Sequence, residues 1–225
     1  MKIDILTLFP NMFQGFLQES IIHRAIEKKI VEINTINFRD FSELSNHQVD
    51  DTPYGGGGGM VLRCEPLVKA IEKTRTENTR VILMCPQGKP YSQKKAFALR
   101  NEKHLILVCG HYEGFDERIR EFVDEEISIG NYVLTGGEIP AMVVTDSVVR
   151  LLDGVIKENS YIMESYQDNL LDYPTYTKPS DFRGLKVPEV LLSGDHAKID
   201  AWRNKMREVK TKEKRSDLLR GNKNA

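Results

Sequence analysis

This chain of 225 residues lacks the features by which several protein classes are recognised. Its three cysteines, Cys64, Cys85 and Cys109, form no C-x-x-C pair, which favours buried thiols in a reducing compartment over a disulfide framework. No apolar run approaches the roughly 18 residues of a membrane helix, and the chain starts with a predicted strand rather than a signal peptide. These absences predict a cytoplasmic protein without a membrane partner.

Phosphate-binding motifs are missing as well. Gly88-Lys89 is followed by Pro90 and has no glycine at the offset that G-x-x-x-x-G-K-[ST] requires. The tract from Gly55 to Gly59 does not fit G-x-G-x-x-G, because Met60 occupies the sixth position. A loop that cradles phosphates is therefore disfavoured.

Charge of either sign is not in excess overall, but it is unevenly distributed. The formal net charge is −1, whereas residues 178–225 carry +6 and the preceding 177 residues carry −7. A basic tail on an acidic body predicts a polyanionic partner for the tail.

The first 156 residues alternate apolar strand-like runs with helical patterns. Strands are expected at residues 3–9, 31–38, 80–85, 104–109 and 126–129. Helices are expected at residues 11–28, with a break near Gln18, and at 65–74, 92–101, 116–123 and 139–152. This alternation predicts an α/β fold in which a mostly parallel sheet has helices on both faces.

The pattern changes after Gly154. Residues 157–169 are polar without clear periodicity, which predicts a mobile linker. Helical patterning returns at residues 195–209 and 212–219. We therefore expect a first domain at residues 1–156, a linker at 157–169 and a small helical domain at 170–225.

Three of the expected strands end in glycine-containing turns, which begin at Pro86, Gly110 and Gly130. Because the carboxyl ends of parallel strands share one edge, these turns are expected to converge on a single pocket. The third loop holds Tyr132, Val133 and Leu134 between glycines, as a pocket wall would. Without a phosphate motif, such a pocket suits an uncharged heterocycle such as adenine, although a loop that merely crosses the sheet edge is the structural alternative.

The five glycines from Gly55 to Gly59 allow two interpretations. They lose much backbone entropy on ordering, so the segment is either a flexible surface loop or a loop ordered by close approach to a ligand. The sequence leaves both open.

Together these segments resemble the bacterial tRNA (guanine-N1)-methyltransferase family, the TrmD-type enzymes of the SPOUT superfamily. The resemblance covers nearly the whole chain. It is carried in order by Leu8 to Phe13, Val49 to Tyr54 with the following glycines, Cys85 to Gly88, Leu107 to Gly114, Ser128 to Ala141 and Val187 to Gly194.

The resemblance implies more than the residues themselves predict. It implies a deep trefoil knot, a homodimer with shared active sites, bound S-adenosylmethionine and a tRNA substrate, and it allows a Mg2+ requirement. Residues 1–156 would then be the catalytic and cofactor-binding domain, and residues 170–225 the tRNA-binding domain. The methyl group would go to N1 of the guanosine immediately 3′ of the anticodon, tRNA position 37.

The resemblance also assigns a cofactor site, lined by Pro86, Gln87, Gly88, Gly110, Tyr112, Glu113, Ile129, Gly130, Asn131, Tyr132, Val133, Leu134, Gly136 and Gly137. Asn131 stands where the family usually has aspartate. Asparagine would replace it well in capping a turn but not in a role that needs charge.

Methylation of guanine N1 calls for a general base and for a cation near O6, because N1 of neutral guanine carries a proton. Arg150 matches the family arginine assigned to O6, although an arginine at a helix end also complements the dipole. Glu164 stands near the family aspartate and is the first candidate for the base. Asp168 is a weaker candidate, and a solvated linker glutamate without a role is the structural alternative for Glu164.

The basic tail would contact tRNA phosphates through Lys198, Arg203, Lys205, Arg207, Lys210, Lys212, Lys214 and Arg215. A merely solvated face accounts equally well for about half of them, and Trp202 is expected in the core. Two rival functions remain: a related SPOUT RNA methyltransferase with another target, and a catalytically weakened tRNA-binding protein.

Overall fold

The computed structural model describes residues 1–157, 164–166 and 168–219. The chain divides into two compact units, Met1–Ile156 and Lys157–Ala225, which are described separately below. Within the described residues, no helix combines the length and the apolar character that a bilayer span requires.

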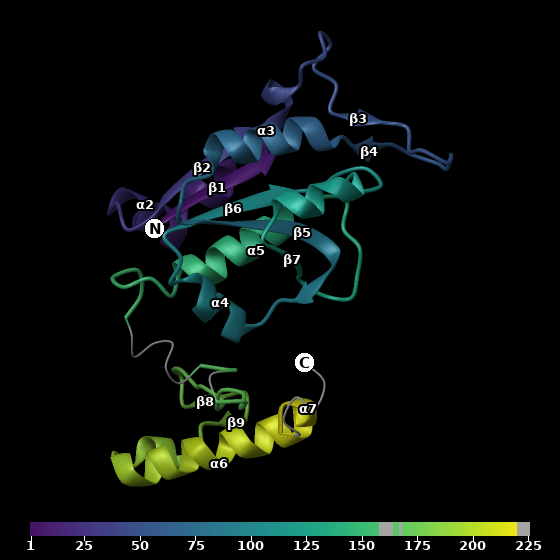
Figure 1. Cartoon of the computed structure of the whole chain (residues 1–225). Coiled ribbons are helices and arrows are strands. Elements are labelled where there is room, and N and C mark those ends of the chain that lie inside the picture. Colours follow the sequence, from purple (N-terminus) through teal and green to yellow (C-terminus); the bar gives the residue numbers. More distant parts are fainter. Residues whose placement is uncertain (158–163, 167, 220–225) are drawn as a thin grey trace. The chain divides into compact units, whose positions relative to one another are not determined.

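A five-stranded sheet forms the centre of the first unit (Figure 1). Its order is β2-β1-β6-β5-β7, and each neighbouring pair is parallel. The strands are β1 (Lys2–Thr7), β2 (Glu32–Asn37), β5 (Thr79–Pro90), β6 (His104–Cys109) and β7 (Glu125–Ser128). The predicted α/β fold with a parallel sheet is confirmed.

Strand β5 runs beyond its predicted end at residue 85. Its register with β7 shifts between Met84 and Lys89, so the intervening residues bulge out of the ladder. This bulge is the turn at Pro86 that the sequence predicts, and the strand resumes after it. A bulge re-aims the backbone next to a site without ending the sheet.

The helices of the first unit are η1 (Pro10–Phe13), α1 (Gln14–Gln18), α2 (Ser20–Glu27), η2 (Phe38–Phe41), α3 (Cys64–Thr74), α4 (Gln93–Leu99), η3 (Glu117–Phe122) and α5 (Glu138–Val149). The expected break near Gln18 lies at Glu19, whose backbone is extended. Residues 116–123 were expected as an ordinary helix, but η3 is a 3-10 helix.

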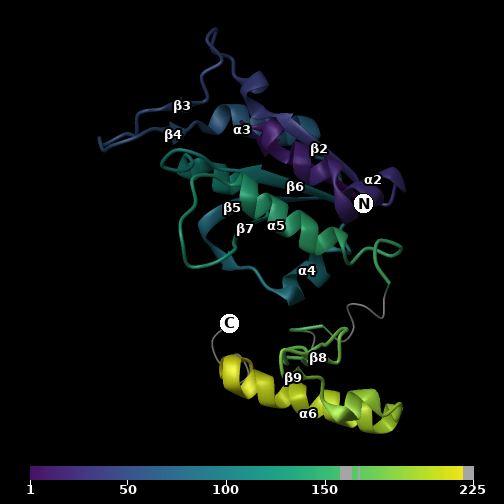
Figure 2. The same ribbon diagram turned by 180° about the vertical axis from the view of Figure 1, so that it is seen from behind.

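Helices cover both faces of the sheet, with α3 on one side and α5 on the other (Figures 1 and 2). Successive residues of β6 point to opposite faces, as in any strand. Leu105 and Leu107 therefore pack in the cluster that contains α5, whereas Ile106 and Val108 pack in the cluster that contains α3. All four are fully buried, and burial of each contributes about 1.5–3 kcal/mol.

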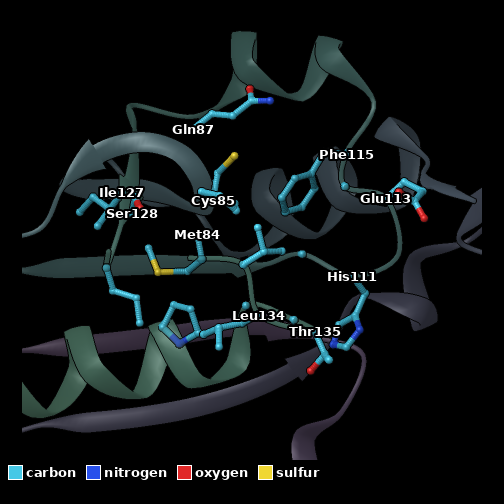
Figure 3. A pocket seen from close by; sticks show the side chains of 18 of the residues that line it. Met84, Cys85, Gln87, His111, Glu113, Phe115, Ile127, Ser128, Leu134 and Thr135 are labelled. Atoms are coloured by element: carbon cyan, nitrogen blue, oxygen red, sulfur yellow. The ribbon is translucent and has the colours of Figure 1, made fainter. Parts of the chain in front are cut away.

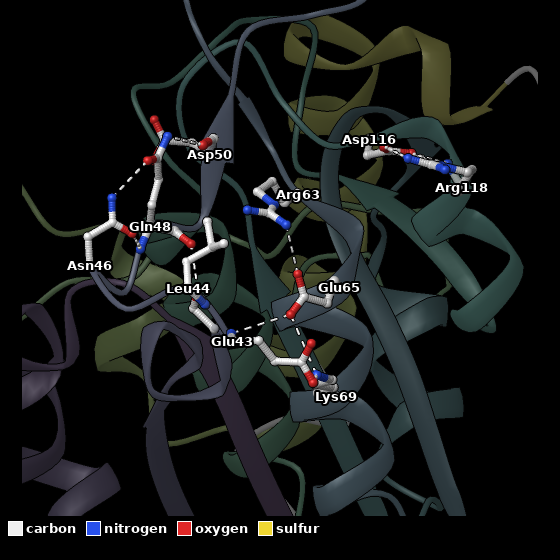
Figure 4. Close-up of polar contacts among 11 residues, drawn as sticks. Glu43, Leu44, Asn46, Gln48, Asp50, Arg63, Glu65, Lys69, Asp116 and Arg118 are labelled. Carbon is white, nitrogen blue, oxygen red and sulfur yellow. Dashed lines mark hydrogen bonds and ion pairs between the residues drawn. The ribbon is translucent and has the colours of Figure 1, made fainter.

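A two-stranded ribbon carries the glycine tract. β3 (Asp50–Asp51) pairs antiparallel with β4 (Val61–Leu62), so the glycines lie in the connection between them. The preceding segment is tied to the start of α3, because the Glu43 N–H donates to Glu65 Oε1 at 3.3 Å (Figure 4). Arg63 Nη2 donates to the other oxygen of Glu65 at 2.9 Å, which fixes the carboxylate between the two.

The second unit contains a small hairpin and one long helix. Its elements are β8 (Asp181–Phe182), β9 (Leu185–Lys186), η5 (Glu189–Leu192), α6 (His196–Lys214) and α7 (Ser216–Leu219). The sequence predicts two helices, at 195–209 and 212–219, with a break between residues 209 and 212. The break lies at Arg215 instead, because no glycine or proline interrupts α6 before it. Residues 158–163 and 167 of the expected linker lie outside the described residues.

Candidate functional site

A cavity of about 300 Å³ lies where the bulge of β5 and the loops after β6 and β7 meet at the carboxyl edge of the sheet (Figure 3). This size falls in the range of small-molecule sites. Its wall includes the residues that the resemblance assigns to the cofactor, with the exception of Gly88 and Asn131. The three glycine-containing loops therefore do converge.

Gly88 and Asn131 lie outside the cavity wall for different reasons. A Cβ on Gly88 would lie 2.5 Å from the Ile127 nitrogen. Gly88 therefore packs closely against the backbone of β7 and not toward the cavity. Asn131 is exposed in the third loop.

The third loop touches the second through its paired glycines. The Gly137 N–H donates to the Gly110 oxygen at 2.9 Å. A Cβ on Gly137 would lie 2.6 Å from Cys109 Cα, and one on Gly136 would lie 2.4 Å from His111 Nε2. Because any larger residue would push the loops apart, this close backbone approach explains the glycine pair.

A buried carboxyl group stabilises the contact between the second and third loops. Glu138, at the first position of α5, is only 1% exposed. It accepts a hydrogen bond from Thr7 Oγ1 at 2.7 Å, and its other oxygen lies 2.8 Å from His111 Nε2. A helix N-terminus favours an acidic side chain, and the contacts join the end of β1 to the pocket.

Sequence reasoning missed Thr7, His111 and Glu138. His111 lines the cavity, and the centre of its ring lies 4.7 Å from that of Phe9, with the two rings tilted by 59°. Phe9 belongs to the segment Leu8 to Phe13. The available signal was a glutamate directly after the glycine pair at the start of an apolar helix. A glutamate at this position is as typical of an ordinary helix N-terminus as of a ligand-binding site.

The rim of the cavity is polar. Arg120 Nη2 donates to Gln87 Oε1 at 2.9 Å, and the Arg120 guanidinium also pairs with Glu117 and Glu126. Glu113, Glu117 and Arg120 all line the cavity, so its wall carries charged groups of both signs. The Glu117 carboxylate is paired with Arg120, which leaves Glu113 as the acidic group that can face a positively charged ligand.

The apolar wall of the third loop is largely uncovered. Tyr132 is 56% exposed and Val133 is 82% exposed, which is unusual for large apolar side chains in a loop bounded by glycines. A ligand in the cavity would cover part of this surface. Among the thiols, Cys85 lines the cavity and is half-buried, whereas burial raises the pKa of Cys109 well above its usual range.

The candidate catalytic residues belong to different units. Arg150 directly follows α5 in the first unit, and its N–H donates to the Asp146 oxygen at 3.1 Å. Glu164 belongs to the second unit. Asp168 receives two hydrogen bonds from Arg207, at 2.9 and 2.6 Å, which hold the pKa of its carboxyl group below the usual range. A lowered pKa makes Asp168 a weak proton acceptor.

The basic residues of α6 are not equivalent. Lys205, Lys212 and Lys214 are exposed, whereas Arg207 is only 4% exposed and faces Asp168. The Arg203 guanidinium lies 5.0 Å from the centre of the Tyr173 ring. Trp202 is half-buried, with its ring 6.5 Å from that of Tyr176. The exposed lysines are therefore the groups most available to an anionic partner.

In the part of the chain that the structure describes, no three histidine, cysteine, aspartate or glutamate side chains cluster as metal ligands would. The side chains of these described residues therefore do not offer a donor set for a metal ion held by the protein alone.

The fold and the cavity define a class: an α/β protein whose parallel sheet has a cavity of small-molecule size at its carboxyl edge, followed by a basic helical unit. The sequence narrows that class. A profile of the family described as tRNA (Guanine-1)-methyltransferase TrmD matches residues 1–221, and the chain belongs to this family.

Curated relatives agree with this assignment. A tRNA (guanine-N(1)-)-methyltransferase of Staphylococcus carnosus is 58% identical over 222 residues, which are 97% of this chain and 91% of the relative. The protein of the same name from Macrococcus caseolyticus is 58% identical over 221 residues, which are 97% of this chain and 92% of the relative. That of Staphylococcus aureus strain Newman is 56% identical over 222 residues, 97% of this chain and 91% of the relative.

Proposed function

We propose that this protein transfers the methyl group of S-adenosylmethionine to N1 of the guanosine at tRNA position 37. The observation that supports it best is the cavity between the three loops, whose wall contains most residues that the resemblance assigns to the cofactor. The family and the names of the relatives give the substrate class.

The cavity wall suits S-adenosylmethionine in two respects. The uncovered side chains Tyr132 and Val133 offer an apolar surface to adenine, while backbone groups of the glycine-rich loops read its edge. Glu113 on the cavity wall offers a carboxylate to the positive sulfonium, whereas Glu117 is paired with Arg120. When bound, this molecule supplies an electrophilic methyl group.

The protein must then activate guanine, because N1 of the neutral base holds a proton. Glu164 is the general base that accepts this proton, and Arg150 stabilises the negative charge that develops on O6. Arg150 belongs to the first unit of the chain and Glu164 to the second. No step is assigned to Mg2+, because the described side chains do not form a cluster for it.

We also propose that the enzyme is a homodimer with shared active sites and works in the cytoplasm. Exposed apolar side chains of the first unit support the dimer, since Phe9 and Met12 are 45% and 48% exposed, and Ile139 and Val143 on α5 are 49% and 41% exposed. Light scattering after size exclusion is expected to give a dimer for the unchanged protein and a monomer for Val143→Asp. Leu44→Asp, at an apolar position 36% exposed elsewhere, is the control.

The function is tested by incubating the protein with labelled S-adenosylmethionine and tRNA transcripts that carry G or A at position 37. Label in the G transcript alone is expected. Label in the A transcript would contradict the choice of base and favour a related enzyme with another target. Tight tRNA binding without label in either transcript would favour a catalytically weakened binding protein.

A further inference from the structure

One face of α6 packs against another segment of the same unit and is therefore not available to a binding partner. Arg207, Thr211 and Arg215 follow one another at intervals of four residues, so they lie above one another on the helix and at its end. Arg207 is 4% exposed and Thr211 is fully buried. Such burial in a helix otherwise rich in exposed lysine calls for a structural partner.

The partner is a turn formed by Ser165, Tyr166 and residues 168–172. Arg207 donates two hydrogen bonds to Asp168, at 2.9 and 2.6 Å. Thr211 Oγ1 accepts one from the Leu171 N–H at 2.8 Å, and Arg215 Nη1 donates to the Tyr166 hydroxyl at 3.3 Å. Three successive positions of one helix face thus contact one short turn.

The turn is also closed by its own hydrogen bonds. The Tyr166 N–H donates to the Leu170 oxygen at 2.9 Å, and the Asp172 N–H donates to Ser165 Oγ at 2.9 Å. Tyr166 and Asn169 have φ angles of +75° and +62°, which few non-glycine residues adopt without support from neighbours. Contacts from α6 supply that support.

We infer that Arg207, Thr211 and Arg215 are positioning residues that hold the turn directly following Glu164 and so set where its carboxylate is presented. The inference rests on the proposed function, in which Glu164 is the general base. It gives Arg207 and Asp168 a new role. Arg207 does not serve tRNA phosphates and Asp168 is not a second base; their ion pair orders the backbone beside the base.

The test uses the full chain with tRNA carrying G at position 37 and S-adenosylmethionine. Asp168→Asn weakens the pair while α6 keeps its residues, and a misplaced base costs on the order of 10²-fold in rate. We expect kcat to fall by about tenfold to a hundredfold, with the S-adenosylmethionine affinity unchanged. Glu208→Gln, the same chemical change on an exposed position of α6, is the matched control and should leave kcat unchanged.

Two further readouts separate positioning from folding and from the identity of the base. Hydrogen exchange at the Tyr166, Leu171 and Asp172 amides should accelerate in Asp168→Asn, and the remaining rate should keep the pH profile of the unchanged enzyme. Thr211→Ser keeps the hydroxyl and should retain activity, whereas Thr211→Val should lose it. These two variants keep the test decisive if Asp168→Asn fails to fold.

An unchanged kcat despite faster exchange in the turn would overturn the inference, and so would a lower kcat with unchanged exchange. Glu164→Gln is assayed beside them. If its turnover is unchanged, the proposed base fails, which is a result distinct from failure of the positioning contacts because the exchange rates do not depend on it.

Discussion

Replacement of Gly136 by alanine tests the close approach on which the pocket depends. The added Cβ would lie 2.4 Å from His111 Nε2 and 2.5 Å from Glu138 Oε2. Glu138 is held by Thr7 and is almost fully buried, so His111 is the side chain that must yield, and its 2.8 Å contact with Glu138 is lost.

Leaving a buried polar group without its partner costs about 1–3 kcal/mol. If the loop adopts its pocket conformation only in the complex, the whole cost appears as an affinity for S-adenosylmethionine lower by about fivefold to 150-fold. If the free protein already holds that conformation, the cost appears as a lower melting temperature. Calorimetric titration and thermal unfolding together measure both parts.

Gly15→Ala is the matched control, because nothing lies within 4 Å of a Cβ at that position. It should leave the affinity unchanged and raise stability slightly, since alanine favours the helix over glycine. If Gly136→Ala changed neither the affinity nor the melting temperature, the contact between the second and third loops would not build the site.

Three other outcomes are expected. Glu164→Gln should abolish turnover while leaving S-adenosylmethionine affinity nearly intact, as measured by single-turnover kinetics and titration; turnover at the normal rate would remove Glu164 as the base. Iodoacetamide should alkylate Cys85 in the free protein and more slowly with S-adenosylmethionine bound, while Cys109, whose thiol pKa burial raises, stays unmodified; equal labelling of Cys85 with and without ligand would place the ligand elsewhere. Because Arg207 lowers the pKa of Asp168, their pair stabilises the folded chain above the unfolded pKa of about 3.9 and less as the pH falls below it. The difference in melting temperature between the unchanged protein and Asp168→Asn should therefore stay constant from pH 7 to about pH 5 and shrink as the pH falls below about 4, and a difference that does not shrink would contradict this.

The sheet was predictable because its strands are short apolar runs separated by helical patterns. β6 is buried on both faces, and such strands read as continuous apolar segments. Three features of the fold could not be predicted from the sequence. β5 continues past its bulge, η3 is a 3-10 helix rather than an α-helix, and α6 runs to Lys214. The reason is that local propensity does not record which neighbours a segment packs against. The trefoil knot stays a prediction from resemblance, since no periodicity encodes the threading of a loop.

The candidate site divides in the same way. Glycines and apolar side chains at strand ends are visible in the sequence, and the loops that carry them do converge. In the sequence, Glu138 lies more than a hundred positions from Thr7 and nearly thirty positions from His111. No local pattern therefore reveals these two contacts. For Arg207 the sequence gives the wrong expectation. A charged residue among lysines is expected to be exposed, but Arg207 is buried and paired with Asp168.

The most direct measurement of the central claim is the chemical identity of the product. The unchanged protein is incubated with S-adenosylmethionine and a tRNA transcript carrying G at position 37, and the digested nucleosides are separated and identified by mass spectrometry against standards. The account predicts N1-methylguanosine, one per tRNA, located at position 37. Methylation at N7, at a ribose hydroxyl or at another guanosine would contradict it, because none of these products requires a base and a cation arranged around N1 and O6 of that guanine.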